Sequence, residues 1–243
     1  MNFKTNIFYL RELLFPSGCG GCKEALLDPE DAFYGLCKKC RDILTSAFRG
    51  EKNCDICGRP LITENNTCLS CRKNGAAENG VYNEWIINLK TLFPYTGVFR
   101  KILGAYKFRM SLGVGNFLVS CLHAAYIDYK KSEYSAWVPV PPRPGKIKKQ
   151  GWDQIEFLAK LLKKQGIHVN RCLKRLPSRT QKELNREERN VNLKGKIICI
   201  KPPPKTAFLF DDVITTGATL NACAKALLEG GTEKVYGLCL FYD

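Results

Sequence analysis

The chain has 243 residues, 45% of them hydrophobic and 25% charged, and its formal net charge is +15. It can bury a core of ordinary size, and its length allows one or two domains. Near the amino terminus, the apolar runs at 7–10 and 13–15 are short and separated by Arg11 and Glu12, and no small-residue cleavage site follows them. We therefore expect a cytoplasmic protein with no integral membrane segment.

Cysteines are concentrated in the amino-terminal third. In a reducing compartment, the 13 cysteines do not indicate a disulfide framework, so their spacing needs another explanation. Two thiolates separated by two residues can bind the same ion, and two such pairs complete the tetrahedral sulfur site that zinc favours. The simplest prediction is two structural zinc ions, bound by four Cys-x-x-Cys pairs: Cys19 and Cys22, Cys37 and Cys40, Cys54 and Cys57, and Cys68 and Cys71.

Other assignments use the same ligands. An iron–sulfur cluster also takes four cysteines, and a redox-active dithiol takes one pair, but repeated pairs are more typical of zinc ribbons. The zinc ions can be bound sequentially, with the first four of these cysteines at one site and the next four at the other. In a cross-braced arrangement, alternating pairs would share a site. The spacing alone is compatible with both.

The cysteine pairs end just before residues 73–79, which have the composition of a short linker. We therefore predict a cysteine-rich double zinc ribbon module over 1–78 and a second domain over 79–243. Apolar patterns in the second domain predict strands at 86–93, 136–140, 196–200, 207–210 and 235–241, and helices at 98–107, 116–129, 154–165 and 220–229. This alternation predicts an α/β fold with a parallel sheet.

The most distinctive segment of the second domain spans residues 208–220. An apolar run ends in Asp211 and Asp212, and a hydroxyl-rich loop containing Gly217 follows directly. A loop in this position lies at the carboxyl edge of a parallel sheet, where backbone N–H groups at the start of the next helix can surround a phosphate. The two carboxylates would repel a phosphate. They suit the vicinal hydroxyls of a ribose or a magnesium ion.

This segment resembles the signature of the type I phosphoribosyltransferases, which bind phosphoribosyl pyrophosphate (PRPP) with magnesium. The resemblance implies a Rossmann-like parallel sheet and a glycosyltransferase (pentosyltransferase) reaction in which Asp211 and Asp212 are catalytic. It also implies a PRPP site formed by nine consecutive residues: Asp211, Asp212, Val213, Ile214, Thr215, Thr216, Gly217, Ala218 and Thr219. The chain has no distinctive base-recognition element and no glutaminase domain, so the acceptor is not identified.

Nearly the whole chain resembles the ComF family, bacterial proteins that join a zinc ribbon module to a phosphoribosyltransferase-like domain and are associated with DNA uptake in natural transformation. The shared features are the cysteine array, residues 14–16, 106–108, 138–141 and 150–154, and the spacing of Arg175, Gln181, Leu184, Arg189 and residues 192–195. Gln150 and Asp153 depart from the family pattern. The resemblance implies a catalytic role for Lys107 and PRPP contacts from Arg175 and Arg189.

Almost all of the net positive charge lies in the second domain. Residues 81–243 hold 27 basic and 13 acidic side chains, whereas residues 1–80 hold 11 and 10. The excess between Arg143 and Lys205 predicts a polyanionic partner. We expect Lys107 and residues 143–149 to stabilise the pyrophosphate that leaves PRPP.

Two other functions fit this distribution of charge. One is a single-stranded DNA-binding adaptor that uses the fold without catalysis and stacks bases on Trp152 and Phe157, although core packing is the simpler interpretation of these aromatics. The other is a pentosyltransferase of nucleotide metabolism. In each case, the zinc module offers a surface for other DNA-uptake proteins.

Overall fold

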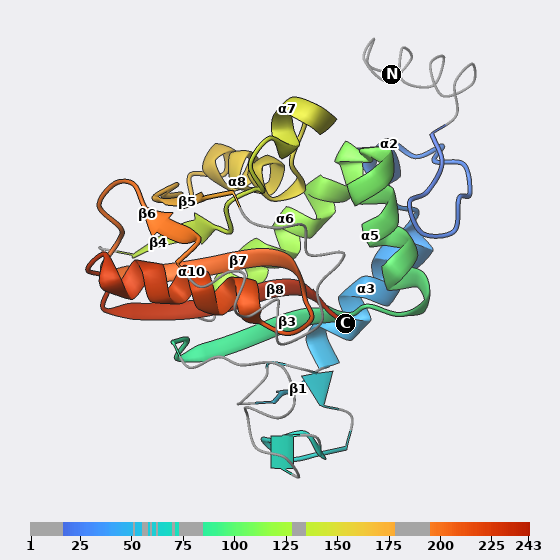
Figure 1. Cartoon of the computed structure of the whole chain (residues 1–243). Helices are drawn as coiled ribbons and strands as arrows, with labels where there is room; N and C mark the ends of the chain where they lie inside the picture. Colours follow the sequence, from blue (N-terminus) through green and yellow to red (C-terminus); the bar gives the residue numbers. More distant parts are fainter. Residues whose placement is uncertain are drawn as a thin grey trace.

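The fold is mixed α/β, built around a four-stranded parallel sheet in the order β3-β8-β7-β4. The computed structural model in Figure 1 describes residues 17–50, 52–54, 58, 60–61, 63–69, 71–72, 85–127, 135–177 and 195–243. The sheet strands are β3 (Asn88–Pro94), β4 (Ser135–Pro139), β7 (Thr206–Ile214) and β8 (Lys234–Tyr242). The predicted fold class is confirmed.

Helices connect the parallel strands and cover both faces of the sheet (Figure 1). Helices α5 (Gly97–Arg109) and α6 (Leu112–Ile127) lead from β3 to β4, and α7 (Lys146–Gln150) and α8 (Gln154–Lys164) follow β4. Helix α10 (Ala218–Glu229) leads from β7 to β8. Alternate residues of β7 face opposite sides, so Phe208 and Phe210 pack with α5, α6 and α8, whereas Leu209 packs with α10.

Two elements differ from the predictions in ways that affect the site. Residues 196–200 do contain a strand, β6 (Ile197–Cys199), but it pairs antiparallel with β5 (Leu173–Arg175) outside the main sheet. Ile198 is 38% exposed, so this strand lacks the burial on both faces that a central parallel strand has. Strand β7 continues past the predicted end at residue 210 to Ile214, so the two aspartates lie within the strand.

The first half of the cysteine-rich segment packs into the core of the sheet domain. It contains α2 (Pro29–Tyr34) and α3 (Lys38–Gly50). Cys19, Leu36 and Leu44 belong to the same buried cluster as Ile102 of α5 and residues of α6. In addition, Asn116 Nδ2 of α6 donates to the Phe33 carbonyl at 2.9 Å. This half of the segment shares its hydrophobic core with α5 and α6.

The second half contacts the edge strand β3. It contains β1 (Lys52–Asn53) and β2 (Pro60–Leu61), which pair antiparallel. Thr91 Oγ1 of β3 donates to the Gly58 carbonyl at 2.5 Å, and Leu61 packs in one cluster with Leu89. Figure 1 shows this part of the chain beside β3, away from α5 and α6. The expected linker at 73–79 and the boundary between residues 78 and 79 lie outside the described residues.

Candidate ligand site and metal centres

The two aspartates of β7 occupy different environments. Asp212 is only 5% exposed, and its Oδ2 lies 2.8 Å from Lys107 Nζ and accepts from Gln154 Nε2 at 2.7 Å. Asp211 is less buried and accepts the Asp212 backbone N–H on its Oδ1 at 2.8 Å. The structure therefore brings the predicted residues Asp211, Asp212 and Lys107 together.

Burial and proximity of the two carboxyl groups affect the ionisation of Asp211. Its pKa is raised to about 8, first because burial disfavours the charged form and second because the Asp212 charge is close. The Asp212 N–H and the Lys107 ammonium oppose this effect. The site therefore favours the protonated form of Asp211 more than an exposed aspartate would, and the Lys107 ammonium lies against the Asp212 carboxylate.

The loop after β7 has the form expected of a phosphate site. Gly217 adopts a left-handed φ of 73° and forms the N-cap of α10 without a side-chain cap hydrogen bond. Thr215 is exposed, and Thr216, Ala218 and Thr219 are half-buried. The Ala218 N–H contacts Thr216 Oγ1 at 3.4 Å, a long hydrogen bond. The loop and the first turn of α10 therefore present hydroxyl and N–H groups beside the aspartates.

Arg175, at the end of β5, supplies a buried cation whose charge interacts with Asp211. Its side chain is 7% exposed, and its Nε has no hydrogen-bond partner among the described residues. Burial lowers the pKa of Arg175, as does the neighbouring Arg143, whereas Cys223 and Asp211 favour the charged form. A buried guanidinium with an unsatisfied N–H group is costly in the absence of an anion. Arg189, Gln181 and Leu184 lie outside the described residues.

Sequence reasoning missed the role of Gln154, and it included Lys146 only as part of the basic segment 143–149. Besides donating to Asp212, Gln154 accepts on its Oε1 from Lys146 Nζ, which also contacts Asp153 Oδ2 at 2.5 Å. The Gln154 amide thus links the basic segment after β4 to the aspartate pair. Asp153 also caps α8, accepting the N–H groups of Ile155 and Glu156 at 2.9 and 3.0 Å. An aspartate directly before a helical apolar pattern is the signal that predicts this cap.

The aromatic residues of this region pack against one another. Tyr106 and Trp152 meet edge to face with ring centroids 5.4 Å apart, and Trp152 and Phe157 do so at 6.4 Å. The Tyr106 hydroxyl donates to the Gln154 carbonyl at 2.5 Å. Trp152 and Phe157 therefore pack against other aromatic side chains, in agreement with the simpler interpretation of the sequence. This aromatic cluster supports the start of α8.

The cysteines form two separate clusters. The Sγ atoms of Cys19, Cys22, Cys37 and Cys40 lie within 4.8 Å of one another, and those of Cys54, Cys68 and Cys71 do so elsewhere. Cys57, the expected fourth ligand of the second cluster, lies outside the described residues. Because both early pairs meet at one point, their positions fit sequential rather than cross-braced ligation. The sulfur-only donor sets fit the structural zinc predicted from the spacing.

Backbone N–H groups surround the thiolates of both clusters. Cys19 Sγ accepts from Gly21 and Cys37 at 3.4 and 3.3 Å, and Cys54 Sγ accepts from Cys68 at 3.3 Å. Although burial opposes ionisation of Cys19, the N–H groups of Cys37, Cys22 and Gly21 lower its pKa to about 7. These bonds favour the thiolate, the form that binds a metal.

Comparison with known proteins agrees with both parts of this arrangement. Residues 10–73 match the family model described as a double zinc ribbon domain. The chain is 28% identical to competence protein ComFC of Streptococcus pneumoniae, over 82% of this chain and 84% of the relative. It is 26% identical to competence protein F of Haemophilus influenzae over 83% and 87% of the two chains, and 25% identical to ComFC of Bacillus subtilis over 85% and 82%.

Across the described part of the chain, no helix has both the length and the apolar character needed to cross a membrane.

The similarities to known proteins extend through the sheet domain as well as the cysteine clusters. They agree with the resemblance found in the sequence: the chain is similar to ComF competence proteins over most of its length, and its amino-terminal part matches a double zinc ribbon.

Proposed function

We propose that this protein binds PRPP with magnesium at residues 211–219 and acts as a phosphoribosyltransferase-like protein in DNA uptake, in the cytoplasm. The observation that carries the proposal is the buried Arg175, whose Nε lacks a partner among the described residues and whose charge interacts with Asp211 of β7 and Cys223 of α10. The guanidinium of Arg175 and the N–H groups at the start of α10 are complementary to phosphate groups. The carboxylate pair is complementary to the ribose hydroxyls.

Each part of the ligand has a chemically matched partner. The hydroxyl and N–H groups of residues 215–219 suit the terminal phosphate, and the oxygens of Asp211 and Asp212 accept hydrogen bonds from the ribose. Carboxylate oxygens are also suitable ligands for magnesium, which neutralises pyrophosphate charge when it is bound. Lys107 contacts Asp212, and Lys146 contacts Gln154, which donates to Asp212; Arg143 lies in the same basic segment as Lys146. These cations can stabilise the charge that develops on a departing pyrophosphate.

The division of the chain has a functional meaning in this proposal. Residues 79–243 carry the PRPP site, while the zinc ions of residues 1–78 stabilise the helices that support it. The relatives are named competence proteins, which supports a role in DNA uptake. The exposed surface of the zinc ribbons remains available to other proteins of that process.

Thermal unfolding tests the binding claim. A ligand that binds only the folded state stabilises it by about 2.7 kcal/mol at 100 times its Kd. We expect magnesium and PRPP together to raise the Tm of the wild type and not that of the Asp211→Asn, Asp212→Asn double variant. Magnesium with pyrophosphate is the control for a general polyanion effect. An unchanged wild-type Tm at saturating PRPP would contradict the proposal.

Catalysis requires a separate assay because the acceptor is unidentified. PRPP-dependent release of pyrophosphate, measured across a panel of bases, amines and nucleic acids, distinguishes a transferase from a PRPP-responsive adaptor. A pentosyltransferase of nucleotide metabolism would turn over with a free base. A single-stranded DNA-binding adaptor would show salt-dependent DNA affinity without pyrophosphate release. The exposed Lys148 and Lys149 of α7 are the observation that keeps this second candidate open.

A further inference from the structure

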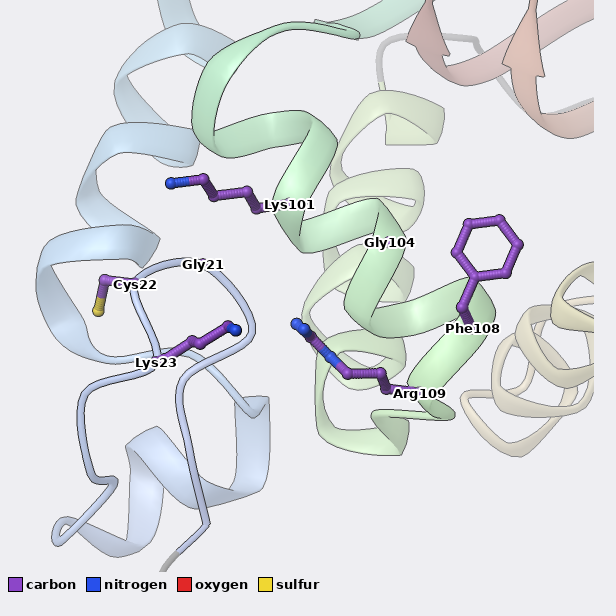
Figure 2. Close-up of a pocket in the computed structure, with 7 residues that line it drawn as sticks. All are labelled: Gly21, Cys22, Lys23, Lys101, Gly104, Phe108 and Arg109. Atoms are coloured by element: carbon purple, nitrogen blue, oxygen red, sulfur yellow. The ribbon is translucent and has the colours of Figure 1, made fainter.

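A pocket of about 480 Å³ lies between the first zinc-binding loop and α5. Gly21 and Lys23 line it from the loop, and Lys101, Gly104 and Arg109 line it from the helix. Figure 2 shows Lys101 and Arg109 extending from α5 toward the loop, with Lys23 directed toward Arg109; Cys22 and Phe108 also line the pocket. The cationic groups thus come from two segments far apart in the sequence.

The hollow continues past these side chains. A second pocket of about 440 Å³ shares Lys23 and Arg109 with the first and extends along Gly18 and Ser111. The proposed PRPP site uses none of these residues. Helix α5 contributes to both sites, since Lys107 contacts Asp212 while Lys101 and Arg109 line the pocket.

Gly104 is an unexpected residue at its position. It lies in the middle of α5, where glycine is among the least favourable residues for a helix. A Cβ added there would meet no atom within 4 Å, so close packing does not require the glycine. The absence of a side chain keeps the pocket open between Lys101 and Arg109.

Lys23 departs from backbone preference in the opposite sense. Its φ of 70° lies in the left-handed region, which glycine adopts without strain and lysine does not. Its N–H donates to the Cys19 carbonyl at 2.9 Å, which ties this conformation to the turn of the zinc-binding loop. The same pocket is therefore lined by Lys23, at a position whose backbone favours glycine, and by Gly104, at a helical position that favours alanine. Such local conflicts concentrate at functional sites.

The charges of the pocket favour an anion. Lys23, Lys101 and Arg109 make no ion pair with any residue that the structure describes, and Arg109 only donates to the Gly20 carbonyl at 3.4 Å. Glu24, on the same loop as Lys23, has its Oε2 3.8 Å from Cys22 Sγ of the zinc site. Cys22, an exposed zinc ligand, also lines this pocket, but its side chain points away from Arg109 in Figure 2.

We propose that this pocket is a second anion site, which binds a phosphate or phosphodiester group between Lys23, Lys101 and Arg109. The shared chemistry is a tetrahedral phosphorus group with negatively charged oxygens. It can belong to a small phosphorylated molecule or to a nucleic acid strand. The zinc ribbon has almost no net positive charge of its own, so the site exists only because α5 adds Lys101 and Arg109.

Nuclear magnetic resonance of the zinc-loaded full chain tests the proposal at the level of single amides. Inorganic phosphate should give saturable shifts of the amides of Gly21, Lys23 and Gly104 in the wild type. Gly104→Leu, which fills the pocket, and Lys101→Glu should abolish these shifts. Lys160→Glu, which changes an exposed lysine of α8, is the charge-matched control and should retain them. Thermal melting checks the fold, and Gly104→Leu should melt no lower than the wild type because leucine favours the helix.

A single-stranded oligodeoxynucleotide then identifies the source of the phosphate group. If the strand displaces inorganic phosphate at these amides, the site belongs to a nucleic acid path; if it does not, the site belongs to a small phosphorylated ligand. Absence of saturable shifts with both probes in a folded, zinc-loaded wild type would overturn the proposal, as would shifts that persist in Gly104→Leu and Lys101→Glu. The cations would then only offset the charge of the zinc thiolates.

Discussion

Alanine substitution at two helical glycines should have opposite effects if the first zinc ribbon is part of the core. Replacing glycine by alanine in a helix is favourable by up to about 1 kcal/mol. At Gly104 of α5, the new Cβ would meet nothing within 4 Å, so Gly104→Ala should raise the free energy of unfolding by up to about 1 kcal/mol. It is the matched control for the same change in α6.

At Gly113 of α6, the new Cβ would lie 2.6 Å from the backbone N of Gly35 and 2.8 Å from its Cα. Gly35 cannot move away easily, because its left-handed φ of 61° and its N–H bond to Ala32 form the C-cap of α2. Overpacking of this kind costs about 1–3 kcal/mol. After a helix gain of about 1 kcal/mol is subtracted, Gly113→Ala should lower the free energy of unfolding by roughly 0–2 kcal/mol.

Urea unfolding followed by two signals measures both variants. Tryptophan fluorescence reports on the sheet through the buried Trp137, and a chromogenic chelator reports zinc release. The two transitions should coincide at the first zinc site, since Cys19 and Leu36 share a core with Ile102. The reasoning is refuted if both variants are stabilised alike, or if this zinc is lost well before the fluorescence changes.

Three further predictions concern the site and the metals. Gln154→Ala removes the donor 2.7 Å from Asp212 Oδ2, and the loss of a net hydrogen bond of about 1 kcal/mol should weaken PRPP binding about fivefold to tenfold. The control is Asn170→Ala, which removes an amide that contacts the Pro202 carbonyl. Equal PRPP affinities of the two variants would contradict the role of Gln154. Because the pKa of Asp211 is raised to about 8 and the ligand requires its ionised form, binding should release a proton below that pH. PRPP affinity should therefore rise from about pH 6 to pH 8 and then level off, and calorimetry in buffers of different ionisation enthalpy detects the proton; an affinity that falls with rising pH argues against this. Cys40→Ser should lose one zinc ion per chain by elemental analysis, whereas Cys121→Ser, at a buried cysteine outside the clusters, should keep both; the same metal content in the two variants would exclude the assigned ligands.

The sheet could be predicted from the sequence because its strands are continuous apolar runs, and residues 207–210 and 235–241 coincide with the buried centres of β7 and β8. The aspartate pair and the loop could be predicted for a similar reason, since their chemistry is encoded in consecutive residues. The family resemblance implied that Lys107 and Asp212 act at the same site. The contact between the two side chains could be found only in the structure.

Contacts between distant segments could not be predicted. Gln154 and Asp212 are 58 residues apart, and nothing in the local pattern of either indicates their hydrogen bond. Cysteine spacing indicated a metal but not which pairs share it, because identical ligands fit both arrangements. Nor could spacing show that the first ribbon enters the core of the sheet domain, which depends on the close approach of Gly35 and Gly113.

Calorimetric titration of the zinc-loaded full chain with PRPP in the presence of magnesium tests the central claim most directly. We predict saturable binding with one PRPP per chain for the wild type, retained by Lys160→Glu and lost in the Asp211→Asn, Asp212→Asn double variant. Arg175→Met should bind PRPP more weakly than the wild type, because the substitution removes the buried cation. Absence of binding by the wild type, or equal binding by the double variant, would contradict a PRPP site at residues 211–219.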